Sequence, residues 1–293
     1  MPGVAFVVNG SLVRGGGHLV ALCRKEAKRH GWDAELLVTE KAEAGVTAAC
    51  GAALDGADLV VAVGGDGTVR GCAEGLAGTG VPLGIVPHGT ANLLARTLRL
   101  PGRPRAALAA ALGGGGADRV IDLAVADGEP FTAMAGMGLD AAVVAGTKLK
   151  HQFGWLAYAV SGAMHLALPP AQVLISLDGA APVEREARSV VVGNSGLLPG
   201  GFSLLPDARL DDGVLDVGLL APHGPFGWPR LATRVLTSSS YQDRMLERFQ
   251  ARKVEVSTPA LLPREVDGEL IPPGHTLTVT VRPGALTVRV PPL

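Results

Sequence analysis

The stretch that decides the fold lies at residues 59–68 and reads Leu-Val-Val-Ala-Val-Gly-Gly-Asp-Gly-Thr. Its opening apolar run is mostly β-branched, which predicts a strand buried on both faces. Glycines follow at once, and residues 69–76 have the apolar spacing of a helix. Continuous apolar strands that lead into helices are typical of parallel sheets covered on both faces. The stretch therefore predicts a strand–turn–helix unit with a ligand site at the turn, because open α/β sheets bind ligands beyond the carboxyl ends of their strands.

A second unit of the same kind follows. An apolar run at residues 83–86 leads into Pro-His-Gly-Thr-Ala-Asn at 87–92, and a helix is predicted to start at Leu93. The other predictions for this half are strands at 4–8 and 34–38, helices at 19–30, 48–54 and 105–112, and a glycine-rich loop at 9–18. Strands that alternate with helices predict an α/β domain with a mostly parallel sheet, which we assign to residues 1–124.

The pattern changes after Asp122. Short alternating stretches separated by Pro and Gly clusters predict antiparallel strands at 189–192, 214–219, 254–257, 277–281 and 286–290. Helical segments are predicted at 154–168 and 226–249. We therefore expect residues 125–293 to form a β-rich sandwich domain that completes a cleft with the first domain, and we expect the last strand to return to the first domain.

Composition excludes several classes of protein. Among the 293 residues, aromatic side chains make up only 4% and the net charge is −1, so a nucleic-acid partner is not expected. No apolar run reaches the length of a membrane span and the N-terminus lacks a signal-peptide pattern, which predicts a cytoplasmic protein without a transmembrane segment. Three cysteines without metal-site spacing predict reduced thiols. Basic residues between Arg230 and Lys253 predict either a solvated face or transient peripheral contact with a membrane.

The two glycine turns carry the chemistry. Glycines let a phosphate approach the backbone, and a helix N-terminus offers it N–H donors. A carboxylate at Asp66 would repel phosphate unless Mg²⁺ or a substrate hydroxyl lies between them. Thr90 and Asn92 add a hydroxyl and an amide at the same edge of the sheet. The ordinary alternative is that Thr68, Thr90 and Asn92 only cap helices.

These motifs resemble a known family. Gly-Gly-Asp-Gly-Thr at 64–68 with Pro-His-Gly-Thr-Ala-Asn-Leu-Leu-Ala-Arg at 87–96 is similar to the catalytic domain of diacylglycerol, sphingosine and ceramide kinases, above all their small soluble bacterial members. Further landmarks follow in the family's order at 121–123, 136–140, 200–202, 206–213 and 267–269. The resemblance implies an NAD kinase/diacylglycerol kinase-like first domain, and an ATP-dependent lipid kinase that phosphorylates a hydroxyl of diacylglycerol or a related amphiphile.

The resemblance also implies site residues and partners. The ATP contacts would come from Thr39, Gly64, Gly65, Asp66, Gly67, Thr68, Val69, Arg70, Thr90 and Asn92. A Mg²⁺ ion would be held by the Asp212 carboxylate and the carbonyls of Arg209 and Val214. Glu269 matches the proton acceptor, with Asp66 and Asp267 as helpers; Asp66 stays open as the base. The implied partners are a lipid at a membrane surface and a second copy in a homodimer.

Two other functions fit the same motifs. Gly-Gly-Asp-Gly is shared with NAD kinases, which differ in their acceptor. A non-catalytic nucleotide or lipid sensor on the same fold would have no need of the acidic residues. Three positions depart from the family's usual pattern, namely Gly10, Arg70 and Leu93, and Leu93 stands where many relatives have an aspartate.

Overall fold

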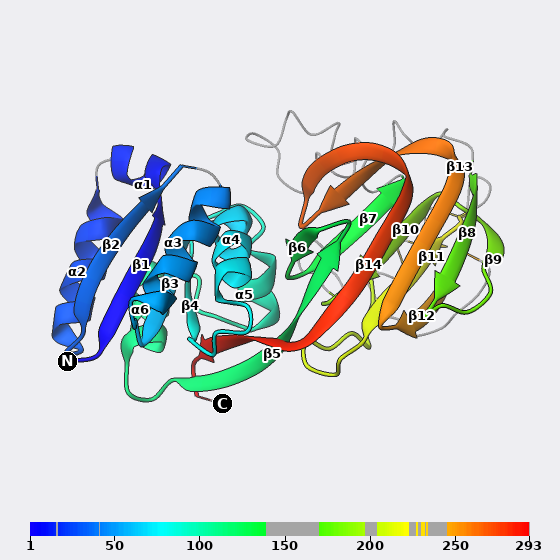
Figure 1. Cartoon of the computed structure of the whole chain (residues 1–293). Coiled ribbons are helices and arrows are strands. Elements are labelled where there is room, and N and C mark those ends of the chain that lie inside the picture. Colours follow the sequence, from blue (N-terminus) through cyan, green and yellow to red (C-terminus); the bar gives the residue numbers. More distant parts are fainter. Residues whose placement is uncertain are drawn as a thin grey trace. The chain divides into compact units, whose positions relative to one another are not determined.

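The computed structural model describes residues 1–15, 17–40, 42–138, 170–196, 204–222 and 245–292, together with Gly227, Arg230, Leu231 and Thr233. It divides into two compact units (Figure 1). Unit 1 comprises Met1–Leu123 and Gly284–Leu293, and unit 2 comprises Ala124–Pro283. The helix predicted at 154–168 lies outside the described residues.

Unit 1 is built on a parallel sheet. Its strands run in the order β2 (Asp33–Thr39), β1 (Gly3–Asn9), β3 (Leu59–Gly64) and β4 (Leu83–Pro87), and all neighbouring pairs are parallel. Strands β3 and β4 are buried along their whole length. The predicted strand–turn–helix units therefore exist, and the carboxyl ends of these strands lie at one edge of the sheet.

Helices cover this sheet (Figure 1). They are α1 (Gly10–Arg14), α2 (His18–Arg29), α3 (Ala42–Leu54), α4 (Asp66–Leu76), α5 (Leu93–Thr97) and α6 (Pro104–Leu112). Phe6, Val8 and Val61 pack with Ala27 of α2 and Leu108 of α6 in one apolar core. The loop predicted at 9–18 was wrong in part, because α1 forms there. The Asn9 side chain accepts a hydrogen bond from the Ser11 N–H at 3.0 Å and so caps the short helix.

Small residues bring α3 and α4 close together. A side chain on Gly75 of α4 would lie 3.0 Å from the Cys50 nitrogen and 3.1 Å from the Ala49 Cβ, both on α3. Gly45 of α3 similarly faces the backbone of Gly71 at 3.7 Å. This contact leaves no room for larger side chains, so it fixes α4 and with it the glycine turn at the start of that helix.

The cysteines of unit 1 give a simple test of this core. Burial raises the pKa of Cys23 and of Cys72 to about 12, whereas Cys50 is only partly buried. A neutral, inaccessible thiol does not react with alkylating agents. We expect iodoacetamide at pH 8 to label the native protein at Cys50 alone and to label all three cysteines in guanidinium chloride. Intact-mass spectrometry with peptide mapping measures this, and native labelling of Cys72 would contradict the packing of α4.

Unit 2 consists of antiparallel strands. Strand β5 (Ala117–Ala126) leads from unit 1 into unit 2. The strands that follow it are β6 (Glu129–Phe131), β7 (Met134–Gly138), β8 (Ala171–Leu177), β9 (Val183–Ala187), β10 (Ser189–Gly193), β11 (Leu215–Leu220), β12 (Leu246–Ala251), β13 (Lys253–Val266) and β14 (Glu269–Val290). The path β12-β11-β10-β7-β13-β14 is antiparallel throughout. Alternate residues such as Met137, Val217 and Val279 form its core.

Two predictions for this half were wrong. Residues 246–249, predicted as the end of a helix, belong to strand β12, where Val217 pairs with Phe249. The strands predicted separately at 277–281 and 286–290 form one strand, β14. Its Pro-Gly step does not end the strand because Gly284 adopts φ +60° and donates its N–H to Asp122 Oδ1 at 2.7 Å. The chain of β14 thus passes from unit 2 into unit 1.

Candidate active site

The two glycine turns contact each other backbone to backbone. Gly64 at the end of β3 pairs with Pro87 at the end of β4. The His88 N–H donates to the Gly64 carbonyl at 2.7 Å. A Cβ on Gly89 would lie 2.6 Å from the Gly65 Cα, closer than real Cβ atoms come. Glycine is required here by the approach of the two turns, and the result is one continuous surface of backbone at the carboxyl edge of the sheet.

Asp66 ties these turns together. It is the first residue of α4, and its carboxylate accepts the Asn92 N–H at 2.8 Å through Oδ2 and the Leu93 N–H at 2.6 Å through Oδ1. Those N–H groups open helix α5, where donors have no intrahelical partner. Bonds to an ionised carboxylate are about twice as strong as neutral ones. Asp66 therefore caps α5, and both of its oxygens accept a hydrogen bond from the backbone.

Asn92 shapes the second turn. It adopts φ 47° and ψ 52°, which asparagine tolerates better than most residues. Its Nδ2 donates to the Gly89 carbonyl at 2.8 Å. Its Oδ1 is buried and accepts no hydrogen bond from the residues that the structure describes. A buried acceptor without a donor is costly, so this oxygen suits a ligand or water donor at the turn.

The other residues predicted to hold ATP lie around the same edge. Thr39 is buried at the end of β2, where it pairs with Asn9. The Thr68 side chain lies directly over Gly64, where a Cβ would collide with it. Val69 is buried, and its N–H donates to the Gly65 carbonyl at 3.1 Å. Gly67 and Arg70 stand in the first turns of α4 and are partly exposed, and Thr90 is exposed.

Glu269 begins strand β14 in unit 2, next to a tight hairpin. Asp267 (φ 48°) and Gly268 (φ 78°) form the two-residue turn, and Val266 pairs with Glu269. Positive φ at both central residues is the mark of a type I′ turn, whose twist matches that of the strands. Glu269 is exposed. The Glu269 carboxylate therefore lies at the end of the paired strands β13 and β14, directly after the turn.

Asp267 has a structural task in this hairpin. Only 6% of the residue is exposed. Its Oδ2 accepts the Thr132 N–H at 3.0 Å and the Thr132 hydroxyl at 3.2 Å, and its Oδ1 accepts the N–H groups of Ala133 and Met134 at 2.9 and 3.1 Å. Asp267 therefore anchors the hairpin to the turn between β6 and β7. Its catalytic role stays a prediction.

The predicted metal residues form an exposed turn before β11. Asp212 Oδ1 accepts the Val214 N–H at 3.2 Å, and Gly213 adopts φ +74°. An exposed carboxylate with neighbouring carbonyls is the oxygen chemistry that Mg²⁺ binds, with water completing its coordination. Within the described ranges, no group of three or more His, Cys, Asp or Glu side chains converges to hold a metal. The donor types fit the predicted ion, and the site itself stays a prediction.

Sequence reasoning missed Asp216, which lies beside this turn. Burial raises its pKa to about 6; the Gln250 hydrogen bond opposes this shift, and the charges of Asp212 and Asp207 add to it. Gln250 Nε2 donates to Asp216 Oδ1 at 3.1 Å, whereas Oδ2 is buried and receives no donor within the described part of the chain. An aspartate inside the apolar run 214–219 was the available signal.

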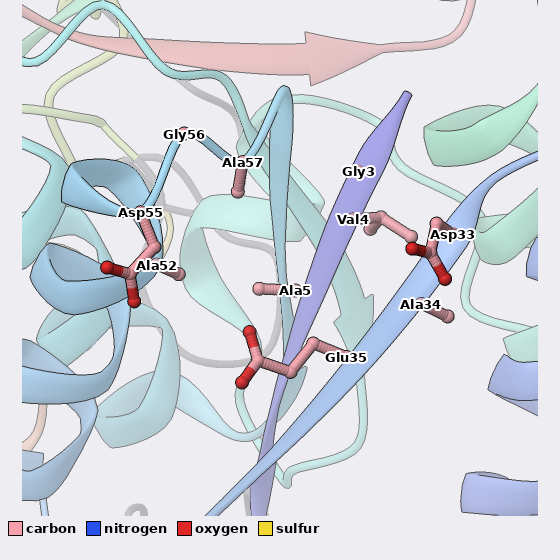
Figure 2. Close-up of a pocket in the computed structure, with 10 residues that line it drawn as sticks. All are labelled: Gly3, Val4, Ala5, Asp33, Ala34, Glu35, Ala52, Asp55, Gly56 and Ala57. Carbon is pink, nitrogen blue, oxygen red and sulfur yellow. The ribbon is translucent and has the colours of Figure 1, made fainter. Parts of the chain in front are cut away.

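A pocket of about 330 Å³ lies at the opposite edge of the unit 1 sheet (Figure 2). It opens where β1 and β2 begin, and Figure 2 shows the carboxylates of Asp33, Glu35 and Asp55 around small residues such as Ala5 and Ala52. Three carboxylates repel a triphosphate. This pocket is therefore not a nucleotide site, and the glycine turns remain the candidate.

No helix in the described part of the chain combines the length and the apolar character that a membrane span requires. The residues predicted to bind ATP lie in unit 1, whereas Glu269 and the Asp212 turn lie in unit 2.

A parallel α/β unit with joined glycine turns, followed by an antiparallel β unit with acidic turns, defines a two-domain kinase of the NAD kinase/diacylglycerol kinase class. Residues 4–125 match the model of the diacylglycerol kinase catalytic domain, and residues 133–290 match that of the YegS C-terminal NAD kinase beta sandwich-like domain. The chain belongs to the diacylglycerol kinase-like family of lipid kinases. The predicted family, fold class and kinase activity are confirmed.

Curated relatives match along most of their length. A Pseudomonas fluorescens protein named "Probable lipid kinase YegS-like" is 34% identical over 278 residues, which cover 91% of this chain and 89% of that protein. The Bacillus subtilis protein named "Diacylglycerol kinase" is 32% identical, covering 86% of this chain and 84% of that protein.

Solved structures show the same fold. A crystal structure titled as a diacylglycerol kinase from Bacillus anthracis superposes with a TM-score of 0.75, at 24% identity, over 99% of this chain and 97% of that one. An NAD kinase from Archaeoglobus fulgidus in complex with ATP gives a TM-score of 0.55 at 16% identity, over 97% of this chain and 92% of that one. At these identities the likeness concerns the fold alone.

Proposed function

We propose that this protein is an ATP-dependent lipid kinase that transfers the γ-phosphoryl group of ATP to a hydroxyl of diacylglycerol or a related amphiphile. The observation that carries the proposal is the pair of glycine turns locked together by Asp66. The names of the two curated relatives support the lipid acceptor. Phosphoryl transfer requires mainly positioning of the reactants and neutralisation of charge, and the described residues supply groups for both.

The glycine turns would hold the phosphates. Gly65 and Gly89 expose backbone without side chains, and the first N–H groups of α4, at Asp66 to Thr68, have no intrahelical acceptor. Such N–H groups bind phosphate oxygens, and the positive end of the helix dipole favours the charge. The Asn92 Oδ1 would accept a hydrogen bond from the nucleotide or from water. Thr90 would add its exposed hydroxyl.

Glu269 would accept the proton of the attacking hydroxyl. It is exposed, as a group that meets a substrate must be. Asp66, the other candidate, already accepts the backbone N–H groups of Asn92 and Leu93 through its two oxygens. The exposure of Glu269 favours it as the base, and the two hydrogen bonds give Asp66 the task of holding the turns.

Asp212 and the carbonyls of Arg209 and Val214 would hold a Mg²⁺ ion, which supplies positive charge and stiffens the turn. We expect Asp212→Asn to weaken Mn²⁺ binding by about tenfold or more, because the charged ligand is lost. Electron paramagnetic resonance titration of free Mn²⁺ measures this without an activity assay. The control is Glu129→Gln, which neutralises an exposed carboxylate of β6. Equal Mn²⁺ binding by both variants would remove the site.

The acceptor is tested with radiolabelled ATP and a panel of acceptors. We expect label in diacylglycerol, monoacylglycerol, ceramide or sphingosine, or in a lipid of a bacterial extract, presented in vesicles. Exposed Arg230, Arg252 and Lys253 would favour anionic vesicles at low salt, since each basic side chain near the surface contributes about 1 kcal/mol. NAD and fructose 6-phosphate serve as the competing acceptors. Labelled NADP or fructose bisphosphate, with no labelled lipid, would contradict the proposed lipid-kinase function.

A further inference from the structure

A second buried carboxylate, Glu265, supports the hairpin that carries Glu269. Glu265 lies in β13, opposite Leu270 of β14 and Gly136 of β7, and only 3% of it is exposed. Removing a carboxylate from water costs several kcal/mol unless charged or polar groups compensate. An apolar side chain would suit a buried strand position better. The presence of a glutamate therefore calls for a specific partner.

That partner is the turn itself. Glu265 Oε2 accepts the Gly268 N–H at 2.6 Å, three residues along the chain. The distance is that of a strong, charge-assisted hydrogen bond. Gly268 is the second residue of the type I′ turn, and its carbonyl carbon forms the peptide bond to Glu269. That N–H belongs to the Asp267–Gly268 peptide, so the bond to Glu265 fixes the central peptide of the turn, one peptide before the one that joins Gly268 to Glu269.

The hairpin is held from two sides. Asp267 receives donors from Thr132, Ala133 and Met134, which anchor the first turn residue to the β6–β7 turn. Glu265 holds the second turn residue from within β13. With both turn residues fixed, the backbone of Glu269 has little freedom, and its carboxylate starts from a defined position.

We propose that Glu265 is a positioning residue for Glu269: by accepting the Gly268 N–H, it holds the central Asp267–Gly268 peptide of the turn that leads directly into the proton-accepting residue. This role rests on the proposed function, in which Glu269 takes the proton of the acceptor hydroxyl. Glu265 is itself too buried to meet a substrate. Displacement of a catalytic group by about 1 Å can cost about 10²-fold in rate, so a contact that sets its position matters for turnover.

The test compares Glu265→Ala, which removes the acceptor, with Glu265→Gln, which keeps an acceptor oxygen and loses the charge. We expect Glu265→Ala to lower kcat with the preferred lipid by about tenfold to a hundredfold while the KM for ATP stays within about twofold. Glu265→Gln should restore most of kcat. Hydrogen exchange of peptides covering residues 262–272 should accelerate in the Ala variant and remain slow in the Gln variant.

The matched control is Glu255→Ala. Glu255 stands in the same strand, with its side chain 42% exposed and paired with Lys253 at 2.9 Å. It should leave kcat and exchange in the hairpin unchanged. A folded Glu265→Ala protein with normal kcat would overturn the positioning role and leave the kinase function intact. Equal losses in the Ala and Gln variants would overturn it in favour of a pure charge effect.

Failure of the proposed function looks different. If the unaltered protein labels no lipid, then Glu269 has no acceptor proton to take, and the positioning role falls with the function. The exchange measurement then still reports whether Glu265 holds the hairpin. Loss of native melting in both Glu265 variants, with the control unaffected, would show that the contact serves stability alone and would also overturn the role.

Discussion

Replacing Glu269 with glutamine is expected to reduce kcat by about 10²-fold or more, because a positioned general base typically contributes 10²- to 10⁴-fold. Glutamine keeps the size and the hydrogen-bonding shape of the side chain but cannot take a proton at neutral pH. Glu269 is exposed at the start of β14 and its neighbours Glu265 and Asp267 hold the hairpin, so the variant should melt at the native temperature. Steady-state kinetics with the lipid found in the acceptor panel measures the loss.

Asp66→Asn is the informative comparison. An amide at residue 66 turns one acceptor into a donor that faces the N–H of Asn92 or Leu93. The cost of one unsatisfied buried group is about 1–3 kcal/mol, so we expect a lower melting temperature and weaker ATP binding together. If Glu269→Gln turns over at a nearly normal rate while Asp66→Asn stays folded, binds ATP and is inactive, the base is Asp66.

Most strands and helices of unit 1 could be predicted from the sequence, because the residues that specify each of them are adjacent in the chain. The apolar run at 59–63 and the glycines after it are adjacent in the chain, and each specifies its own strand or turn. The same reasoning could not find the contact between Asp66 and the N–H groups of Asn92 and Leu93. That contact depends on the pairing of β3 with β4, which brings the two turns together.

The misses in unit 2 have the same cause. The Pro-Gly step at 283–284 normally separates two strands. Here the Asp122 carboxylate accepts the Gly284 N–H from more than a hundred residues away, and the strand continues. The sequence analysis did not single out Asp216 or Glu265, because their burial depends on neighbouring strands that the local pattern does not name.

Gly65→Val is expected to weaken ATP binding by about tenfold or more, which corresponds to about 1.4 kcal/mol. Gly65 has φ −90° and ψ −169°, an extended conformation that valine adopts without strain, so the fold should persist. The loss comes from space. Even a Cβ at this position would lie 3.3 Å from the Gly89 Cα, and the two methyl groups of valine would have to occupy the surface where the phosphates approach or push the second turn away.

Isothermal titration calorimetry with ATP and Mg²⁺ measures the change, with circular dichroism to establish folding. Gly51→Ala is the matched control, because Gly51 lies within helix α3 and a Cβ there meets no atom within 4 Å. Alanine should stabilise that helix by up to about 1 kcal/mol and leave ATP binding unchanged. A folded Gly65→Val protein that binds ATP as tightly as the Gly51→Ala control would show that the phosphates do not lie over this turn. The nucleotide would then bind elsewhere on the protein. The pocket at the opposite edge of the sheet would not be that site, because its carboxylates repel a triphosphate.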